Sequence, residues 1–136
     1  MERNFQLLPG VVQVVLEDGL LPADIVPVLS EAARLARAGT WRDLLVVSGR
    51  DDPATAEAVS EALEEMHALD APPPKIAFVA YALPQYSVYH FAEQYAQRFG
   101  IVAKVLISVR EARDWLALEV GISPPADRGA ARSLAK

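Results

Sequence analysis

The segment at residues 48–55 contains the side chains best suited to chemistry. It follows a short apolar run, residues 44–47, and leads into a stretch with helical periodicity. In a parallel sheet such a segment lies at the carboxyl end of a strand, where ligands usually bind, and a helix that starts there adds backbone N–H donors. Gly49 would let a ligand approach the backbone closely, and Arg50 and Asp51 could orient it. This segment is therefore the first candidate for a binding site.

The adjacent carboxylates of Asp51 and Asp52 could also hold a divalent cation. Hard cations usually need more oxygen ligands than two side chains supply, and the sequence offers no third ligand nearby. Asp52 followed by Pro53 is instead a common helix start, with the carboxylate at the N-cap and the proline at the first helical position. The sequence therefore predicts a capped helix start at Asp52, no metal site and no cofactor.

The densest aromatic region of the chain spans residues 81–90. Tyr81 and Tyr86 stand at the expected end of a strand, on either side of Leu83 and Pro84. Amphipathic rings in this place can line an apolar pocket, form a surface for a partner or a second copy of the chain, or simply cover the sheet end. All three interpretations stay open at this point.

Two serine or histidine pairs have spacings that could suggest nucleophilic catalysis. Ser87 and His90 are three residues apart on an expected helix, and His67 precedes Asp70 by the same interval. A hydrolase needs a nucleophile, a base, an orienting acid and oxyanion donors together, and the Gly-x-Ser-x-Gly motif is missing. The dinucleotide-binding glycine motif, the P-loop and the His-Glu-x-x-His motif are missing too. We predict that the chain is not an enzyme.

Composition narrows the classes of partner. The chain has 136 residues, of which 52% are hydrophobic and 23% charged, as expected for one globular domain. Its net charge of −5 argues against nucleic acid and anionic membranes, because both attract clustered Lys and Arg. No cysteine is present, which excludes disulfides and thiolate chemistry. Neither a signal-peptide core nor an apolar run of membrane-spanning length is seen, so we expect a cytoplasmic protein.

The elements that position these residues follow from apolar periodicity. The order is β-β-α-β-α-β-α-β-α, and strands joined by helices of this length must be parallel with right-handed crossovers. The fold class is therefore α/β, with a single-layer, mixed, mostly parallel sheet and helices packed on it. Parallel strands are expected near residues 12–17, 43–48, 75–80 and 102–107. An antiparallel edge strand precedes them, joined through Pro9-Gly10 by a connection that we expect to be looser than a two-residue turn.

Helix boundaries and helix faces can also be predicted. Asp24 is the expected N-cap of the first helix, and Ser108-Val-Arg-Glu111 is typical of a capping box at the last. In the last helix Trp115 should point inward with its apolar neighbours. In the third helix the predicted inward stripe, which leaves out Tyr89 and His90, comprises Val88, Phe91, Ala92, Tyr95 and Phe99. We expect residues 1–120 to form the domain and residues 121–136 to be a flexible tail.

Several stretches carry a resemblance to a known family. These are Gly19 with the helix start at residues 20–25, Lys-Ile-Ala-Phe-Val-Ala at residues 75–80, the aromatic helix at residues 89–95, and residues 102–116, which end in Ala-x-x-Trp-Leu. They resemble STAS-like proteins, that is, the SpoIIAA-like fold of anti-anti-sigma factors and the small bacterial family built on it. The resemblance covers roughly residues 5–118, and its elements are mainly structural. It implies a SpoIIAA-like domain that acts without catalysis, by binding a protein partner or a small apolar or anionic ligand.

The same resemblance suggests a phosphorylation switch as an alternative. Anti-anti-sigma factors carry a phosphorylatable serine in the turn that corresponds to residues 48–55. This chain has Asp-Pro-Ala-Thr there, without the small flanking residues that expose the target. Thr55 is the nearest hydroxyl, and Ser48 is the other candidate.

The resemblance also predicts where the functional surface lies. Consecutive parallel strands are neighbours in this fold, so the loops after the third and fourth strands should lie side by side. The residues expected to meet there are Ser48, Gly49, Arg50, Asp51 and Thr55 from one loop and Tyr81, Leu83, Pro84 and Tyr86 from the other. Such a mixture would suit an anionic or amphipathic ligand, or an acidic loop of a partner protein.

Overall fold

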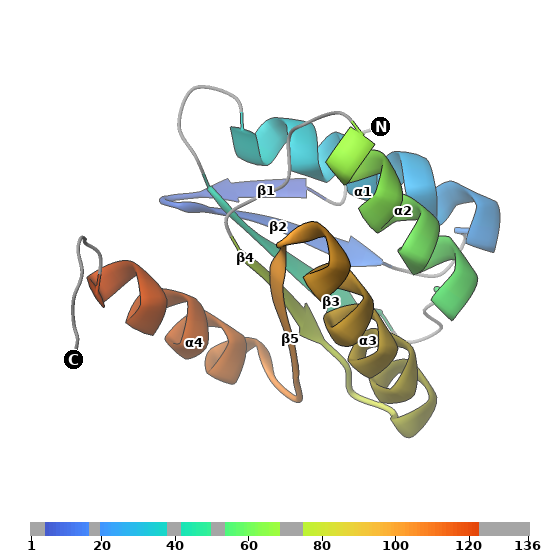
Figure 1. Cartoon of the computed structure of the whole chain (residues 1–136). Helices are drawn as coiled ribbons and strands as arrows, with labels where there is room; N and C mark the ends of the chain where they lie inside the picture. Colours follow the sequence, from blue (N-terminus) through green and yellow to red (C-terminus); the bar gives the residue numbers. More distant parts are fainter. Residues whose placement is uncertain (1–4, 17–19, 38–41, 50–53, 69–74, 123–136) are drawn as a thin grey trace.

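The computed structural model describes residues 5–16, 20–37, 42–49, 54–68 and 75–122, of which residues 118–122 are described by their backbone alone. Asp52, Pro53, Asp70 and residues 123–136 of the expected tail lie outside the described residues. Figure 1 shows the elements in space. Their bounds are β1 (Phe5–Leu8), β2 (Val11–Leu16), α1 (Pro22–Arg37), β3 (Asp43–Ser48), α2 (Ala56–Ala68), β4 (Lys75–Val79), α3 (Leu83–Ala96), the short 3₁₀ helix η1 (Gln97–Phe99), β5 (Val102–Leu106) and α4 (Val109–Ile122).

The sheet has five strands in the order β1-β2-β3-β4-β5. Strands β2 to β5 are parallel, and β1 pairs antiparallel with β2 at one edge. This arrangement confirms the predicted α/β class, the element order and the mixed sheet. Leu16 pairs with Ser48, and Val79 pairs with Leu106, so the carboxyl ends of the parallel strands share one edge of the sheet.

The turn between β1 and β2 differs from its prediction. Leu8 pairs directly with Val11, which leaves Pro9 and Gly10 as a tight two-residue turn. Gly10 has a φ of 75°, the positive value that follows proline in a type II turn. A turn of this type tends to spread the two strands apart. Because β1 has only four residues, the strands separate little over its length and all four residues still pair.

Crossover handedness explains how the helices are distributed. The chain steps across the sheet in one direction, and right-handed crossovers then bring every connecting helix to the same face. Accordingly, α1 packs on α2 and α2 packs on α3 over one face (Figure 1). The helix α4 follows the last strand, so no crossover fixes its side, and it packs on β3, β4 and β5 from the opposite face.

Because successive side chains of a strand point to opposite faces of the sheet, the strands contribute to two separate hydrophobic cores. Val12, Val14 and Leu16 point to the three-helix face and join the larger core. Leu45 and Val47 point to the other face and join a smaller core beneath α4. Every residue of the central strand β3 is buried, as expected for a parallel strand covered on both sides.

The first two helices start at residues other than the predicted ones. The Leu21 backbone N–H donates to Asp24 Oδ2 at 2.8 Å, so Asp24 lies inside the first turn of α1, which begins at Pro22. Pro27 consequently lies within the helix. The helix α2 begins at Ala56, three residues after Pro53, because Thr55 takes the capping role predicted for Asp52.

The last helix starts as predicted. The Ser108 hydroxyl accepts the Glu111 N–H at 3.1 Å, which confirms the serine half of the predicted capping box. Ala112 and Leu116 are buried as expected. Trp115 is only partly buried at the margin of the smaller core, so its predicted inward position is half right.

The predicted inward stripe of α3 is wrong at two positions. Tyr89 is fully buried and stacks on Phe78, with 4.8 Å between ring centroids, whereas Phe91 is 43% exposed. The helix lays its small residues Ala92 and Ala96 on the sheet, which lets it approach closely. The aromatic series at residues 91, 95 and 99 instead follows the flank of α3 toward α2.

Candidate functional site

At the end of β3, the Ser48 side chain and the Gly49 backbone make hydrogen bonds within the protein. Ser48 is buried, and its hydroxyl donates to the Gly49 carbonyl at 3.3 Å. The Gly49 N–H donates to the Leu16 carbonyl at 2.7 Å, which ties the segment to the end of β2. The Ser48 hydroxyl is therefore turned into the protein and not toward an incoming ligand.

Two of the predicted site residues lie outside the described residues. These are Arg50 and Asp51, so their proposed contact with a ligand stays a prediction. Within the described ranges, no group of three or more histidine or carboxylate side chains is arranged to hold a metal ion.

Thr55 caps the helix α2. Its hydroxyl accepts the Ala58 N–H at 3.1 Å, the usual contact between an N-cap side chain and the third helical residue. The side chain is exposed, so a threonine hydroxyl stands at the positive end of a helix dipole in contact with solvent.

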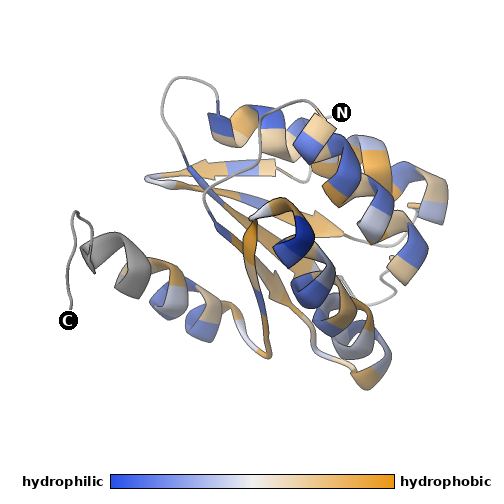
Figure 2. Cartoon of the chain, in the orientation of Figure 1, coloured by the Kyte–Doolittle hydropathy of each residue, from blue (hydrophilic) through white to orange (hydrophobic). Residues whose placement is uncertain are grey.

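Four of the predicted aromatic and apolar residues lie at or just before the start of α3, and all four are exposed. Tyr81 is 61% exposed and Leu83 is 77% exposed, and Pro84 and Tyr86 are exposed as well. Pro84 stands in the first turn of α3, where its missing N–H has no helical partner to lose. Figure 2 shows this beginning of α3 as a hydrophobic tip on an otherwise mixed helix surface.

One further exposed apolar residue stands at this end of the sheet, although the sequence predicted it to lie in a strand. Ile107 follows β5 and is 60% exposed. The Ala80 N–H donates to the Leu106 carbonyl at 2.9 Å, so the segments that carry Tyr81 and Ile107 leave neighbouring strands at the same end of the sheet. We call the four exposed residues Tyr81, Leu83, Tyr86 and Ile107 the carboxyl-edge apolar surface.

His90, the histidine of this region, contacts Tyr86 and Glu93 of its own helix. The His90 ring stacks on the Tyr86 ring at 6.3 Å, and Nδ1 lies 3.5 Å from Glu93 Oε1. The other carboxylate oxygen of Glu93 accepts the Val105 N–H at 2.9 Å, which protects part of the edge strand β5. These contacts place His90 in a network that fastens α3 to β5.

No helix in the described part of the chain is both long and apolar enough to span a membrane. A scan against protein-family models, a search of curated proteins and a search of solved structures each found no match to this chain. The fold that is shown is thus α/β with a five-stranded mixed sheet, and the STAS-like resemblance stays a prediction.

Proposed function

We propose that this protein is a non-enzymatic, STAS-like binding domain that recognises a protein partner through the carboxyl-edge apolar surface. The observation that carries the proposal is the exposure of Tyr81, Leu83 and Ile107, which keep 61%, 77% and 60% of their surface in contact with solvent. Single exposed apolar residues are ordinary, but several that adjoin one another typically mark an interaction site.

The high exposure of these side chains favours a protein partner over a small-molecule ligand at the carboxyl-edge apolar surface. Side chains that line a pocket lose most of their surface to their neighbours, and Leu83 loses little. Tyrosine rings combine apolar area with a hydroxyl that can bond a partner, and they are enriched in protein interfaces. A second copy of this chain would satisfy the same chemistry and is one outcome of the test below.

The family assignment is supported by architecture. The observed element order, the antiparallel edge strand and the neighbouring β3 and β4 agree with the arrangement that the resemblance implies. A domain of this kind would act by binding, in agreement with the absence of a recognisable catalytic motif from the sequence.

The test begins with a partner captured on the full-length protein from its own cells. The affinity of that purified partner is then measured for the wild type, for Tyr81→Ser with Leu83→Ser, and for the control Glu61→Ser on the exposed side of α2. Loss of two apolar anchors should weaken binding by about tenfold or more, while the control should bind like the wild type. Equal affinity of all three proteins would contradict the proposal.

A phosphorylation switch at Thr55 is a second candidate. Its hydroxyl is exposed at the amino terminus of α2, where the dipole and the free N–H groups stabilise a phosphate. Ser48, the other hydroxyl considered, is buried and so is a poor target for a kinase. Mass spectrometry of the protein from its own cells should detect phosphate at Thr55, and a Thr55→Glu variant should change partner affinity without unfolding. A threonine that is unmodified in every growth condition would count against this candidate.

A further inference from the structure

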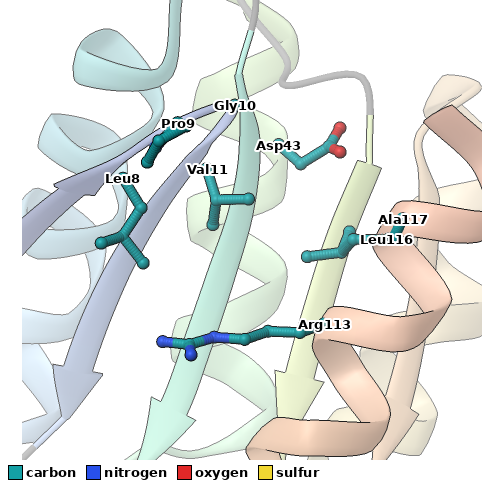
Figure 3. Close-up of a pocket in the computed structure, with 8 residues that line it drawn as sticks. All are labelled: Leu8, Pro9, Gly10, Val11, Asp43, Arg113, Leu116 and Ala117. Atoms are coloured by element: carbon teal, nitrogen blue, oxygen red, sulfur yellow. The ribbon is translucent and has the colours of Figure 1, made fainter.

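A cavity lies at the other end of the strands, near the β1–β2 turn, on the face of the sheet that α4 covers. Its volume is about 410 Å³, which is within the range of small-molecule sites. The cavity opens between the β1–β2 turn and the carboxyl-terminal half of α4 (Figure 3). Leu8 and Val11 line it from the hairpin, and Leu116 and Ala117 line it from the helix.

The cavity follows from the way α4 packs. Its contacts are made with β3, β4 and β5, so the hairpin of β1 and β2 continues beyond the helix on this face. Val11 and Val15 accordingly stay only partly buried at the margin of the smaller core. On the hairpin side, the apolar wall of the cavity is therefore sheet surface that α4 leaves partly uncovered.

The positively charged side chain of Arg113 extends across the cavity. Arg113 extends from α4 across β3 to β2, and its Nη2 donates to Gln13 Oε1 at 2.9 Å (Figure 3). That partner is a neutral amide, and among the described residues no carboxylate is found within ion-pair distance of Arg113. A guanidinium has five N–H donors in a planar fork that matches a carboxylate, so Arg113 can accept an anion without giving up Gln13.

The negative charge of Asp43, which also lines the cavity, is balanced by the ammonium group of Lys75. Asp43 lies at the amino edge with its side chain buried, and Lys75 Nζ stands 3.8 Å from Asp43 Oδ2. The same ammonium donates to the Leu116 carbonyl at 2.6 Å and lies 5.4 Å from the centre of the Trp115 ring. The contacts of Lys75 with Leu116 and Trp115 fasten α4 to β4 beside the cavity. A cationic ligand would meet a carboxylate that already has a positive partner.

We propose that this cavity binds a small amphipathic carboxylate. The apolar part of the ligand packs on Leu8, Val11 and Leu116, and its carboxylate receives hydrogen bonds from Arg113. The site is distinct from the carboxyl-edge apolar surface, which lies at the other end of the strands, so neither proposal depends on the other.

Octanoate is a suitable probe, with octanol and octylamine as neutral and cationic analogues of the same chain length. In an NMR titration of the full-length protein, octanoate should produce saturable shifts at Leu8, Val11 and Ala117, and it should bind more tightly than either analogue. Arg113→Gln should weaken octanoate binding by about tenfold and leave octanol binding unchanged. The matched control, Arg110→Gln, changes an exposed arginine of α4 that does not line the cavity and should behave as the wild type.

A second variant tests the cavity itself. Ala117 is exposed on α4, so Ala117→Phe should be tolerated by the fold while its ring fills the space, which should abolish binding of octanoate and octanol alike. Octanoate shifts that cluster away from the cavity would overturn the proposal. So would an Arg113→Gln protein with wild-type octanoate affinity, or a wild type that binds octanol as tightly as octanoate.

Discussion

The two faces of the sheet differ in how helices cover them. On one face α1, α2 and α3 lie side by side, and the large side chains beneath them, such as Phe78 and Leu29, are fully buried. On the other face α4 packs alone, and Trp115 stays partly exposed beside a cavity. Right-handed crossovers between parallel strands place all the connecting helices on the first face. The second face is covered only by the terminal helix α4, which is too short to cover all of it. Truncation of an apolar side chain should therefore cost more stability on the first face than on the second.

The largest effect is expected on the three-helix face. Phe78→Ala should lower the free energy of unfolding by about 3–5 kcal/mol, because it removes a buried ring that stacks on Tyr89. Urea unfolding followed by circular dichroism measures this change. A loss below about 1 kcal/mol, far under the usual range for such truncations, would mean that this face is not the better-packed one.

The next effect concerns Lys75, which pairs with Asp43 of β3 and holds α4 through the Leu116 carbonyl. Lys75→Met should destabilise the protein by about 3 kcal/mol, because it withdraws the ammonium from the buried Asp43 carboxylate and from the Leu116 carbonyl. The control Lys104→Met alters an exposed lysine of the neighbouring strand β5 and should change stability little. Equal unfolding free energies for the two variants would show that the buried contacts of Lys75 do not stabilise the fold.

A smaller effect is expected at the margin of the smaller core. Trp115→Ala should cost about 1–2 kcal/mol, less than a fully buried tryptophan, because part of the ring already contacts water. In a Trp41→Phe background, which leaves Trp115 as the one tryptophan of the chain, its fluorescence should also be quenched by iodide in the folded protein. A loss as large as that of Phe78→Ala would remove the contrast between the faces.

The smallest effect lies at the contact of α2 with α3. The hydrogen bond that Tyr95 donates to Glu64 raises the pKa of the Tyr95 hydroxyl above its ordinary value of 10. A raised pKa in the folded state means that the contribution to stability is complete below about pH 10 and is lost as the pH rises through the folded-state pKa. The stability difference between the wild type and Tyr95→Phe should therefore shrink above pH 10. Urea midpoints measured from pH 8 to pH 11.5 check this, and a difference that stays constant would contradict it.

Much of the fold could be predicted from the sequence because the signals were local. Apolar runs such as residues 44–47 and 75–80 are too short for buried helices, and the periodic stretches between them are too long for hairpins. Together they required parallel strands and crossover helices. The turn at Pro9 and Gly10 was placed correctly, and only its tightness was misjudged.

Features that depend on the packing of distant elements could not be predicted. The rotation of α3, which buries Tyr89 and exposes Phe91, is set by how closely its alanines approach the sheet. The pairing of Asp43 with Lys75 joins the starts of two strands, and neither residue carries a local sign of a charged partner. The exposure of Ile107 followed from β5 ending one residue earlier than predicted.

For the residues of the predicted site, the structure shows where they stand in the sheet and how exposed they are, and their role stays a prediction. The loops after β3 and β4 do start from adjacent strands, as expected from consecutive parallel strands. Ser48 turned out to be buried, whereas Tyr81 and Leu83 are among the most exposed apolar residues that the structure describes. Sequence patterns identify which side chains stand near the end of a strand, but their exposure depends on what the following helix covers.

Binding of a protein to the carboxyl-edge apolar surface, as proposed above, is tested most directly by photo-crosslinking in living cells. A benzophenone amino acid is placed at position 83 in one strain and at position 61, on the exposed side of α2, in another. Irradiation should produce a discrete adduct of higher mass from position 83 and none from position 61, and an adduct of two chains would identify the partner as a second copy. An adduct from position 61 with none from position 83 would contradict the claim.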